Sequence, residues 1–326
     1  MPLRNKPFAD IFTYSGGDNG TYINVSGSRV ASAADQKRLT HDPETLLSQG
    51  VLIESGATNL FLNSLVDGTN LATQGVTVTA DPYSLSFYGS GTIAFTGAHT
   101  GSLVGTDSTT LSTVTFTPTA GTLTCTVTGT VFWAQIESGD ISTSHIPTAG
   151  AAVTRTSDVL TKTLSDAGEQ YPGGMQIDCL FNVDQFDQSQ VIFQIDDGSE
   201  SNSIKARSLS SGKIQLVVTV SSAETGASSI IDMIDATSVQ VVGDPNDVVI
   251  SADGETPVSI GIAAFPFASM TTLRVGSDAD DINQLNGTIG RITLTPIINQ
   301  ALEDMLEEDG STQLTEEDGL TPLYFG

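Results

Sequence analysis

The sequence has little charge, few aromatic residues, and almost no cysteine or histidine. Charged residues make up 15% of the 326 residues, against about a quarter in an average soluble protein. Cys125 and Cys179 lie in separate alternating apolar runs, which argues against a disulfide framework. His41, His99 and His145 are isolated, and no zinc, nucleophile-elbow or phosphate-loop motif is present. We therefore expect a protein that is not an enzyme.

Long apolar runs and basic residues are also scarce. No apolar stretch approaches the roughly 20 residues of a membrane-spanning helix, and the first residues lack the apolar region of a signal peptide. The net charge of −26 would repel a phosphate backbone. We expect no membrane insertion, no nucleic-acid partner, and synthesis in a cytoplasm.

The acidic residues are unevenly distributed along the chain. Residues 1–60 carry five basic and six acidic side chains, whereas residues 161–326 carry six and twenty-six. The nearly neutral N-terminal segment is therefore the part best suited to docking on another protein.

Gly, Ser and Thr are abundant, and apolar residues alternate with them at period two. In 113–118 and 122–130 the apolar residues fall on one face and threonines on the other, as in strands that bury a single face. A second set of such segments begins at Met175, with Ile177, Cys179 and Phe181 in alternation. The spacing of these segments predicts antiparallel sandwiches.

These patterns predict an all-β protein with two antiparallel β-sandwich domains. We expect an extended N-terminal arm over 1–57, a jelly-roll-like sandwich over 58–157, and a second sandwich over 158–326. One short C-terminal helix is also predicted, with Thr295 as N-cap, Pro296 at the first position, and Ile298, Leu302 and Met305 on one face. The acidic tail that follows ends in TPLYFG, which is able to dock as an apolar clip.

Several motifs resemble, in one order, those of tailed-bacteriophage virion proteins of the tail-fibre, head-fibre and minor structural type. They are the arm FTYSGGDNGTYINVSGSRVASAADQKRLTHDPET, then GVLIESGATNLFLNS at 50–64, then the closing signature WAQIE, TSHIPTAG and TRTSD. His145 stands where a tyrosine is usual. The resemblance covers residues 8–160. More weakly, 285–306 is similar to concanavalin-like or laminin-G-like sandwiches.

This resemblance implies a protein of the virion surface that adheres to a host surface polysaccharide through a carbohydrate-binding-like sandwich. The arm would attach to capsid or tail proteins, and Phe8, Ile11, Phe12 and Tyr22 are the attachment residues we expect. A homo-oligomer, with a trimer as the expected state, is also implied. Two alternatives are open: a capsid decoration or tail subunit that binds no glycan, and a tailspike-like glycan depolymerase.

Two kinds of binding residue can be proposed from the sequence. Asp-rich loops supply the oxygen ligands that calcium prefers, and Asp278, Asp280 and Asp281 are the candidates for a structural calcium site, with solvated turns as the alternative. No other cofactor is expected. Sugar binding uses aromatic platforms, for which Trp133, Tyr83 and Tyr88 are available, although the alternating strand around Trp133 favours a place in the core.

Overall fold

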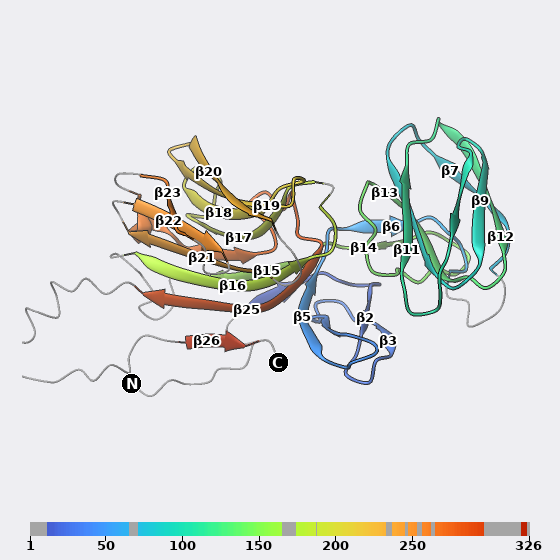
Figure 1. Ribbon diagram of the computed structural model, residues 1–326, viewed down its shortest axis with the longest axis horizontal. Helices are drawn as coiled ribbons and strands as arrows, with labels where there is room; N and C mark the ends of the chain where they lie inside the picture. The colour runs from blue at the N-terminus through green and yellow to red at the C-terminus, as the bar shows by residue number, and fades with distance from the viewer. Residues whose placement is uncertain are drawn as a thin grey trace, which may run out of the picture. The chain divides into compact units, whose positions relative to one another are not determined.

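The computed structural model describes residues 12–64, 71–164, 174–186, 188–232, 237–244, 247–252, 256–261, 265–296 and 321–324. Almost all of the described regular structure is strand, arranged in several sheets in which neighbours such as β9 and β12, or β16 and β25, pair antiparallel (Figure 1). The all-β prediction is confirmed. The chain divides into two compact units: Met1–Tyr14, Gln49–Ile53 and Val159–Gly326 form unit 1, and Ser15–Ser48 with Glu54–Asp158 form unit 2. Residues 12–57 thus contribute to both units.

Unit 2 is a sandwich of short strands. A four-stranded sheet has the order β10-β9-β12-β7, and a three-stranded sheet has the order β11-β8-β13. The strands are β7 (Gln74–Val78), β8 (Tyr83–Tyr88), β9 (Thr92–Gly97), β10 (Gly101–Val104), β11 (Ser112–Phe116), β12 (Gly121–Thr128) and β13 (Phe132–Ser138). Three further pieces complete the unit: the pair β2 (Thr21–Ile23) and β3 (Arg29–Ala31), strand β4 (Leu39–His41), and the pair β6 (Ala57–Asn59) and β14 (Val153–Arg155).

The core of unit 2 lies between its two larger sheets. Leu85, Phe87 and Ile136 come from the three-stranded sheet, and Ile93 and Leu123 from the four-stranded sheet; none exposes any surface. The alternation predicted over 113–118 and 122–130 is confirmed, because Phe116, Leu123 and Cys125 are buried while the threonines between them face outward or are only partly covered.

Unit 1 is built on two larger sheets. One has the order β1-β15-β24-β17-β18-β19-β20, and the other contains β23-β22-β21-β16-β25-β5 with β26 paired to β25. Their strands are β1 (Thr13–Ser15), β5 (Ser48–Ile53), β15 (Val159–Thr163), β16 (Met175–Val183), β17 (Gln190–Asp196), β18 (Ser203–Ser208), β19 (Lys213–Val220), β20 (Ala223–Asp232), β21 (Thr237–Asp244), β22 (Asp247–Ala252), β23 (Val258–Ser259), β24 (Thr272–Val275), β25 (Gly287–Pro296) and β26 (Thr321–Tyr324). A 3-10 turn, η3 (Phe267–Ser269), precedes β24.

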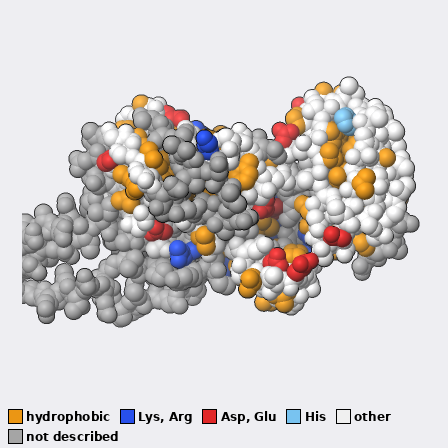
Figure 2. All heavy atoms as spheres, in the orientation of Figure 1, with side chains coloured by type: hydrophobic (Ala, Val, Ile, Leu, Met, Phe, Trp, Pro, Cys, Tyr) orange, Lys and Arg blue, Asp and Glu red, His pale blue; other side chains and the backbone are white. Residues whose placement is uncertain are grey.

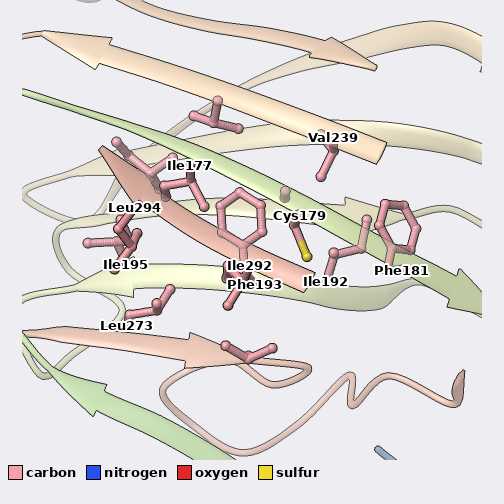
Figure 3. Packing of buried hydrophobic residues seen from close by; sticks show 14 of the residues in the cluster. Ile177, Cys179, Phe181, Ile192, Phe193, Ile195, Val239, Leu273, Ile292 and Leu294 are labelled. Carbon is pink, nitrogen blue, oxygen red and sulfur yellow. The ribbon is translucent and has the colours of Figure 1, made fainter. Parts of the chain in front are cut away.

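The core of unit 1 lies between these sheets. Ile177 and Cys179 on β16 and Ile292 on β25 pack with Phe193 on β17 and Leu273 on β24 (Figure 3). Strand β16 alternates between buried and half-buried residues along its whole length, which confirms the period-two pattern predicted from Met175.

The helix predicted from Thr295 does not begin there. Thr295 and Pro296 are the last residues of β25, and they pair with Gln176 and Met175 of β16. Pairing with β16 continues the strand beyond the residue that the sequence marked as a helix N-cap. Ile298, Leu302 and Met305 lie outside the described residues. Within the expected clip, Thr321–Tyr324 forms β26 and pairs with β25 from Leu294 to Arg291.

Candidate functional site

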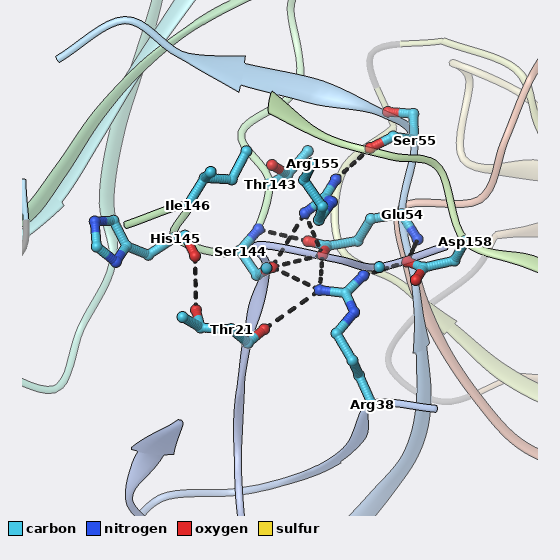
Figure 4. Close-up of polar contacts among 12 residues, drawn as sticks. Thr21, Arg38, Glu54, Ser55, Thr143, Ser144, His145, Ile146, Arg155 and Asp158 are labelled. Carbon is cyan, nitrogen blue, oxygen red and sulfur yellow. Dashed lines mark hydrogen bonds and ion pairs between the residues drawn. The ribbon is translucent and has the colours of Figure 1, made fainter. Parts of the chain in front are cut away.

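A buried cluster of four charged side chains, Arg38, Glu54, Arg155 and Asp158, lies in unit 2 (Figure 4). Glu54 Oε2 lies 2.6 Å from Arg38 Nη1 and 2.7 Å from Arg155 Nη1, and Asp158 pairs with the other Arg38 nitrogen, Nη2. The Ser144 backbone N–H and hydroxyl also donate to Glu54. The two arginines and two carboxylates balance in charge, as burial of ionic groups requires.

The surroundings of Glu54 keep its carboxylate ionised. Burial alone would raise the pKa of Glu54, but the Arg155 and Arg38 guanidinium groups and the two Ser144 donors outweigh it and lower the pKa to about 2. Since all of these groups are buried and paired with one another, the cluster holds the fold together and offers no free group for acid or base chemistry.

A second buried polar network continues from this cluster. The Asn59 side-chain amide donates to the carbonyls of Ala134 and Ile146, and its oxygen accepts from the backbone of Phe61 and Ile136. Ser64 Oγ lies 2.8 Å from His145 Nε2. Burial, with a smaller contribution from the charge of Arg29, lowers the pKa of His145 to about 3, so its ring is neutral.

These two networks gather the motifs that carry the resemblance to phage virion proteins. Arg38 comes from RLTHDP, Glu54, Asn59 and Ser64 from the 50–64 element, and Gln135, Ser144, His145, Arg155 and Asp158 from the closing signature. The motifs lie up to 120 residues apart in sequence at the Arg38–Asp158 pair. The polar and charged residues of these motifs are therefore explained by their contacts in the interior of unit 2.

The candidate binding site of unit 2 is a corner of two half-buried aromatic rings that holds an arginine, and we call Arg29, Tyr88 and Trp133 the aromatic corner. The Tyr88 and Trp133 rings meet edge to face, with 5.6 Å between their centroids and 78° between their planes. The guanidinium carbon of Arg29 lies 4.7 Å from the Tyr88 centroid and 4.9 Å from that of Trp133. Both distances are within cation–π range.

A β-bulge places Trp133 in this corner. Strands β8 and β13 pair at Phe132 and Tyr88 and again at Gln135 and Ser86, so Trp133 and Ala134 both lie opposite Phe87. Trp133 has φ +52°, a left-handed conformation that costs roughly 1–3 kcal/mol for a side chain of this kind. Bulges of this type re-aim a side chain, and here the bulge leaves the only tryptophan of the chain half-buried beside Tyr88.

Arg29 has an unusual environment within this corner. Its Nη1 donates to Thr21 Oγ1 at 3.3 Å, and its buried Nε has no hydrogen-bond partner among the described residues. None of the ion pairs of the described part of the chain involves Arg29, whereas Arg38, Arg155, Arg207 and Arg274 each pair with a carboxylate.

The residues expected to bind calcium do not converge. Asp278 is buried, accepts from the Ile282 backbone at 2.8 Å, and lies 3.4 Å from Lys205 Nζ. Asp280 and Asp281 are exposed. In the part of the chain that the structure describes, no three His, Cys, Asp or Glu side chains form a group able to hold a metal ion.

The residues expected to attach the arm have different environments. Phe8 and Ile11 lie outside the described residues. Phe12 exposes only 3% of its surface and belongs to the core of unit 1, so its side chain is not presented to a partner. Tyr22 is half-buried at the centre of β2.

Trp133 and Tyr88 were candidates from the sequence, and the structure brings them together; Tyr83 is instead buried in the core. Arg29 was missed, because it is 59 residues from Tyr88 in the numbering and no spacing rule connects them. The only hint in the sequence was that Arg29, in the segment 29–31, is a lone cation within a polar stretch of low charge.

No family profile and no curated protein matches the sequence. Solved structures with some similarity include the CBM40 of the Ruminococcus gnavus IT-sialidase bound to α2,3-sialyllactose, at 13% identity and a TM-score of 0.35, covering 44% of this chain and 89% of that one. The Streptococcus pneumoniae NanB sialidase is 14% identical, with a TM-score of 0.37, and the match covers 44% of this chain and 26% of the sialidase. Tailspike protein 2 of the Escherichia coli O157:H7 bacteriophage CAB120 is 14% identical, with a TM-score of 0.36, and the match covers 52% of this chain and 27% of the tailspike.

This chain thus spans about a quarter of the sialidase and of the tailspike. At these identities and TM-scores, the similarities identify no ligand, activity or source for it. Separately, no helix among the described residues is long and apolar enough to cross a membrane.

Proposed function

We propose that this chain is a surface protein of a tailed-bacteriophage particle and that it binds a glycan of the host surface. The aromatic corner is the observation that carries the glycan binding. Saccharides stack their C–H faces on aromatic rings and direct their hydroxyl groups to nearby polar atoms. Tyr88 and Trp133 are half-buried, and neither Tyr88 Oη nor Trp133 Nε1 is hydrogen-bonded within the described residues.

The motif resemblance over residues 8–160 supports a place on the virion, with synthesis in the host cytoplasm before release. The surface is compatible with this role. Among the described residues on the face drawn in Figure 2, uncharged polar side chains and backbone predominate, and carboxylates are scattered among them. Binding rather than cleavage is proposed, because the buried carboxylates of unit 2 are already paired with arginines or backbone donors.

An exposed apolar patch supports attachment to another virion protein. Val25, Leu46 and Leu47, which we call the apolar patch, expose 68%, 47% and 69% of their surfaces. They lie on two adjacent turns, since a Cβ built on Gly27 would lie 2.9 Å from Leu46 Cδ2. Apolar side chains can be seen at the surface over the turns next to β2 and β3 (Figure 2). Exposed apolar patches commonly mark protein interfaces.

A weak monosaccharide affinity would suffice if several copies act together. Multivalent display raises avidity by roughly 10²- to 10⁴-fold without any new contact. We therefore propose a homo-oligomer, with a trimer as the expected state. A monodisperse monomer in light scattering at micromolar concentration would contradict the oligomer.

The test of the proposed function combines location and binding. A cryo-electron microscopy map of the particle should show a few copies projecting from tail or vertex, whereas a regular lattice over the capsid or tube would indicate decoration.

Host polysaccharide should change the fluorescence of Trp133, which is the only tryptophan. Isothermal titration calorimetry, which needs no tryptophan signal, should show weaker polysaccharide binding by the Trp133→Phe variant and unchanged binding by Ile282→Ala, at an exposed apolar side chain of unit 1. Absence of the chain from the particle, or of any binding, would refute the proposal.

A further inference from the structure

We infer that the saccharide bound at the aromatic corner carries a carboxylate group, and that Arg29 is the residue that recognises it. This inference rests on the proposed function and adds the chemical class of the ligand. It starts from an imbalance: the chain has 38 acidic and only 12 basic residues, yet Arg29 is left without a carboxylate among the described residues.

Among the described residues, Arg38, Arg155, Arg207 and Arg274 pair with carboxylates, whereas Arg29 and Arg291 do not, and of these two Arg29 is the one that lies over aromatic rings. Arg38 and Arg155 in the same unit share Glu54, at 2.6 and 2.7 Å. Arg274 lies 2.9 Å from Asp196 in unit 1. These buried or half-buried arginines each pair with a carboxylate of the chain, whereas Arg29 contacts two aromatic rings instead. A cation held in this way keeps its capacity to bind an anion.

The geometry orients the guanidinium group for this task. Two ring contacts and the Thr21 hydrogen bond fix the side chain, so little conformational freedom remains to be lost on binding. Nε is buried, Nη1 is used, and Nη2 has no partner and is not among the buried unpartnered atoms. Nη2 is therefore the nitrogen left at the surface to donate a charge-assisted hydrogen bond.

The rings and the arginine would divide the recognition of such a sugar. The parts of the Trp133 and Tyr88 rings that Arg29 does not cover contact its apolar face, while Arg29 binds the carboxylate that distinguishes an acidic sugar from its neutral counterpart. The net charge of −26 repels an anionic ligand only weakly from a distance. Charges separated by more than about 8 Å are largely screened at physiological salt. The short contact with Arg29 is screened much less.

The test uses the full chain and matched probes, with Trp133 fluorescence as the readout. Methyl glycosides of glucuronic, galacturonic and N-acetylneuraminic acids are titrated beside the methyl glycosides of glucose and galactose. At least one acidic probe should bind the wild type tenfold or more tightly than the neutral probes. Arg29→Gln should lose that preference, and Arg29→Lys should retain part of it.

The outcomes separate this inference from the proposed function. Equal binding of neutral and acidic probes, or an Arg29→Gln variant that keeps the wild-type preference, would overturn the acidic-sugar inference and leave glycan binding intact. If neither the probes nor the host polysaccharide changes Trp133 fluorescence, both fall. A lower unfolding midpoint in Arg29→Gln, with sugar preference unchanged, would identify Arg29 as a clamp between β3 and the sandwich and would also overturn the inference.

Discussion

At the scale of single residues, Glu54 is the central charge of unit 2. It accepts from two buried arginines and from Ser144 at once. Removing one member of such a group leaves the others buried without a partner, which costs far more than the net stabilisation by the intact group.

We therefore expect Glu54→Gln to destabilise unit 2 by about 3–5 kcal/mol. The amide would leave Arg38 and Arg155 with a buried excess of positive charge. Urea unfolding followed by Trp133 fluorescence measures the loss, because Trp133 belongs to the same unit. Glu44→Gln, on an exposed turn, is the matched control and should change the stability by less than about 0.5 kcal/mol. A Glu54→Gln variant as stable as this control would contradict the assignment.

His145 should make unit 2 sensitive to mild acid. Its folded-state pKa of about 3 lies below the ordinary 6.5, so between these values the unfolded chain binds the proton and the folded chain does not. Stability is then complete above about pH 6.5 and decreases as the pH falls, by about 2 kcal/mol near pH 5. Glu54 adds its own loss only below about pH 4.5, as the pH falls toward its folded-state pKa of about 2.

The comparison of wild type with His145→Gln isolates this effect. Urea unfolding at about pH 7 and about pH 5 should show a smaller decrease in stability for the variant than for the wild type. Equal decreases in both proteins would exclude His145 as the titrating group.

At the scale of strands and turns, the sequence was informative wherever one face is buried. The alternation from Met175 to Phe181 and from Leu123 to Cys125 appears directly in β16 and β12, since side chains on a strand alternate between faces. The helix start at Thr295 was wrong because pairing with β16 overrode a local capping pattern. Trp133 was assigned to an ordinary strand because a bulge is set by cross-strand register, which one segment cannot reveal.

Glycine 50 illustrates a local requirement within β5. Gly50 has φ +106°, and a Cβ on it would lie 2.3 Å from the backbone oxygen of Ile289 on β25. We expect Gly50→Ala to destabilise unit 1 by about 3 kcal/mol or more, because backbone strain of roughly 1–3 kcal/mol adds to a clash with a paired strand. Calorimetry should show the loss. Gly150→Ala, where a Cβ meets nothing within 4 Å, should be tolerated, and equal effects would contradict the close approach.

At the scale of the whole molecule, the sequence predicts the strands better than it predicts which distant residues meet. The resemblance located Arg38, Glu54, Arg155 and Asp158 within motifs, but their meeting in one cluster depends on pairs that are far apart in sequence. Similarly, nothing local connects Arg29 with Trp133, or Val25 with Leu47. Composition and periodicity predict which segments are strands, whereas the sites arise from the way the sandwich and its flanking turns bring distant segments together.

The apolar patch gives a prediction for the assembled particle. Burying Val25 and Leu47 against a virion protein would contribute roughly 1.5–3 kcal/mol for each side chain, so replacing both by serine should lower incorporation into particles at least tenfold. The double variant should fold normally, because both side chains are more than two-thirds exposed. Quantitative mass spectrometry of purified particles, produced with the variant as the sole source of this protein, measures the incorporation.

The matched control replaces Val104 and Ile282, which are 64% and 56% exposed but do not belong to the turns at 24–27 and 43–47. This control should assemble at the wild-type level, since exposed apolar side chains outside an interface contribute little to assembly. If the two double variants are incorporated equally well, the apolar patch is not the attachment surface. A specific loss in the Val25 and Leu47 variant would place the attachment surface on unit 2, the same unit that carries the aromatic corner.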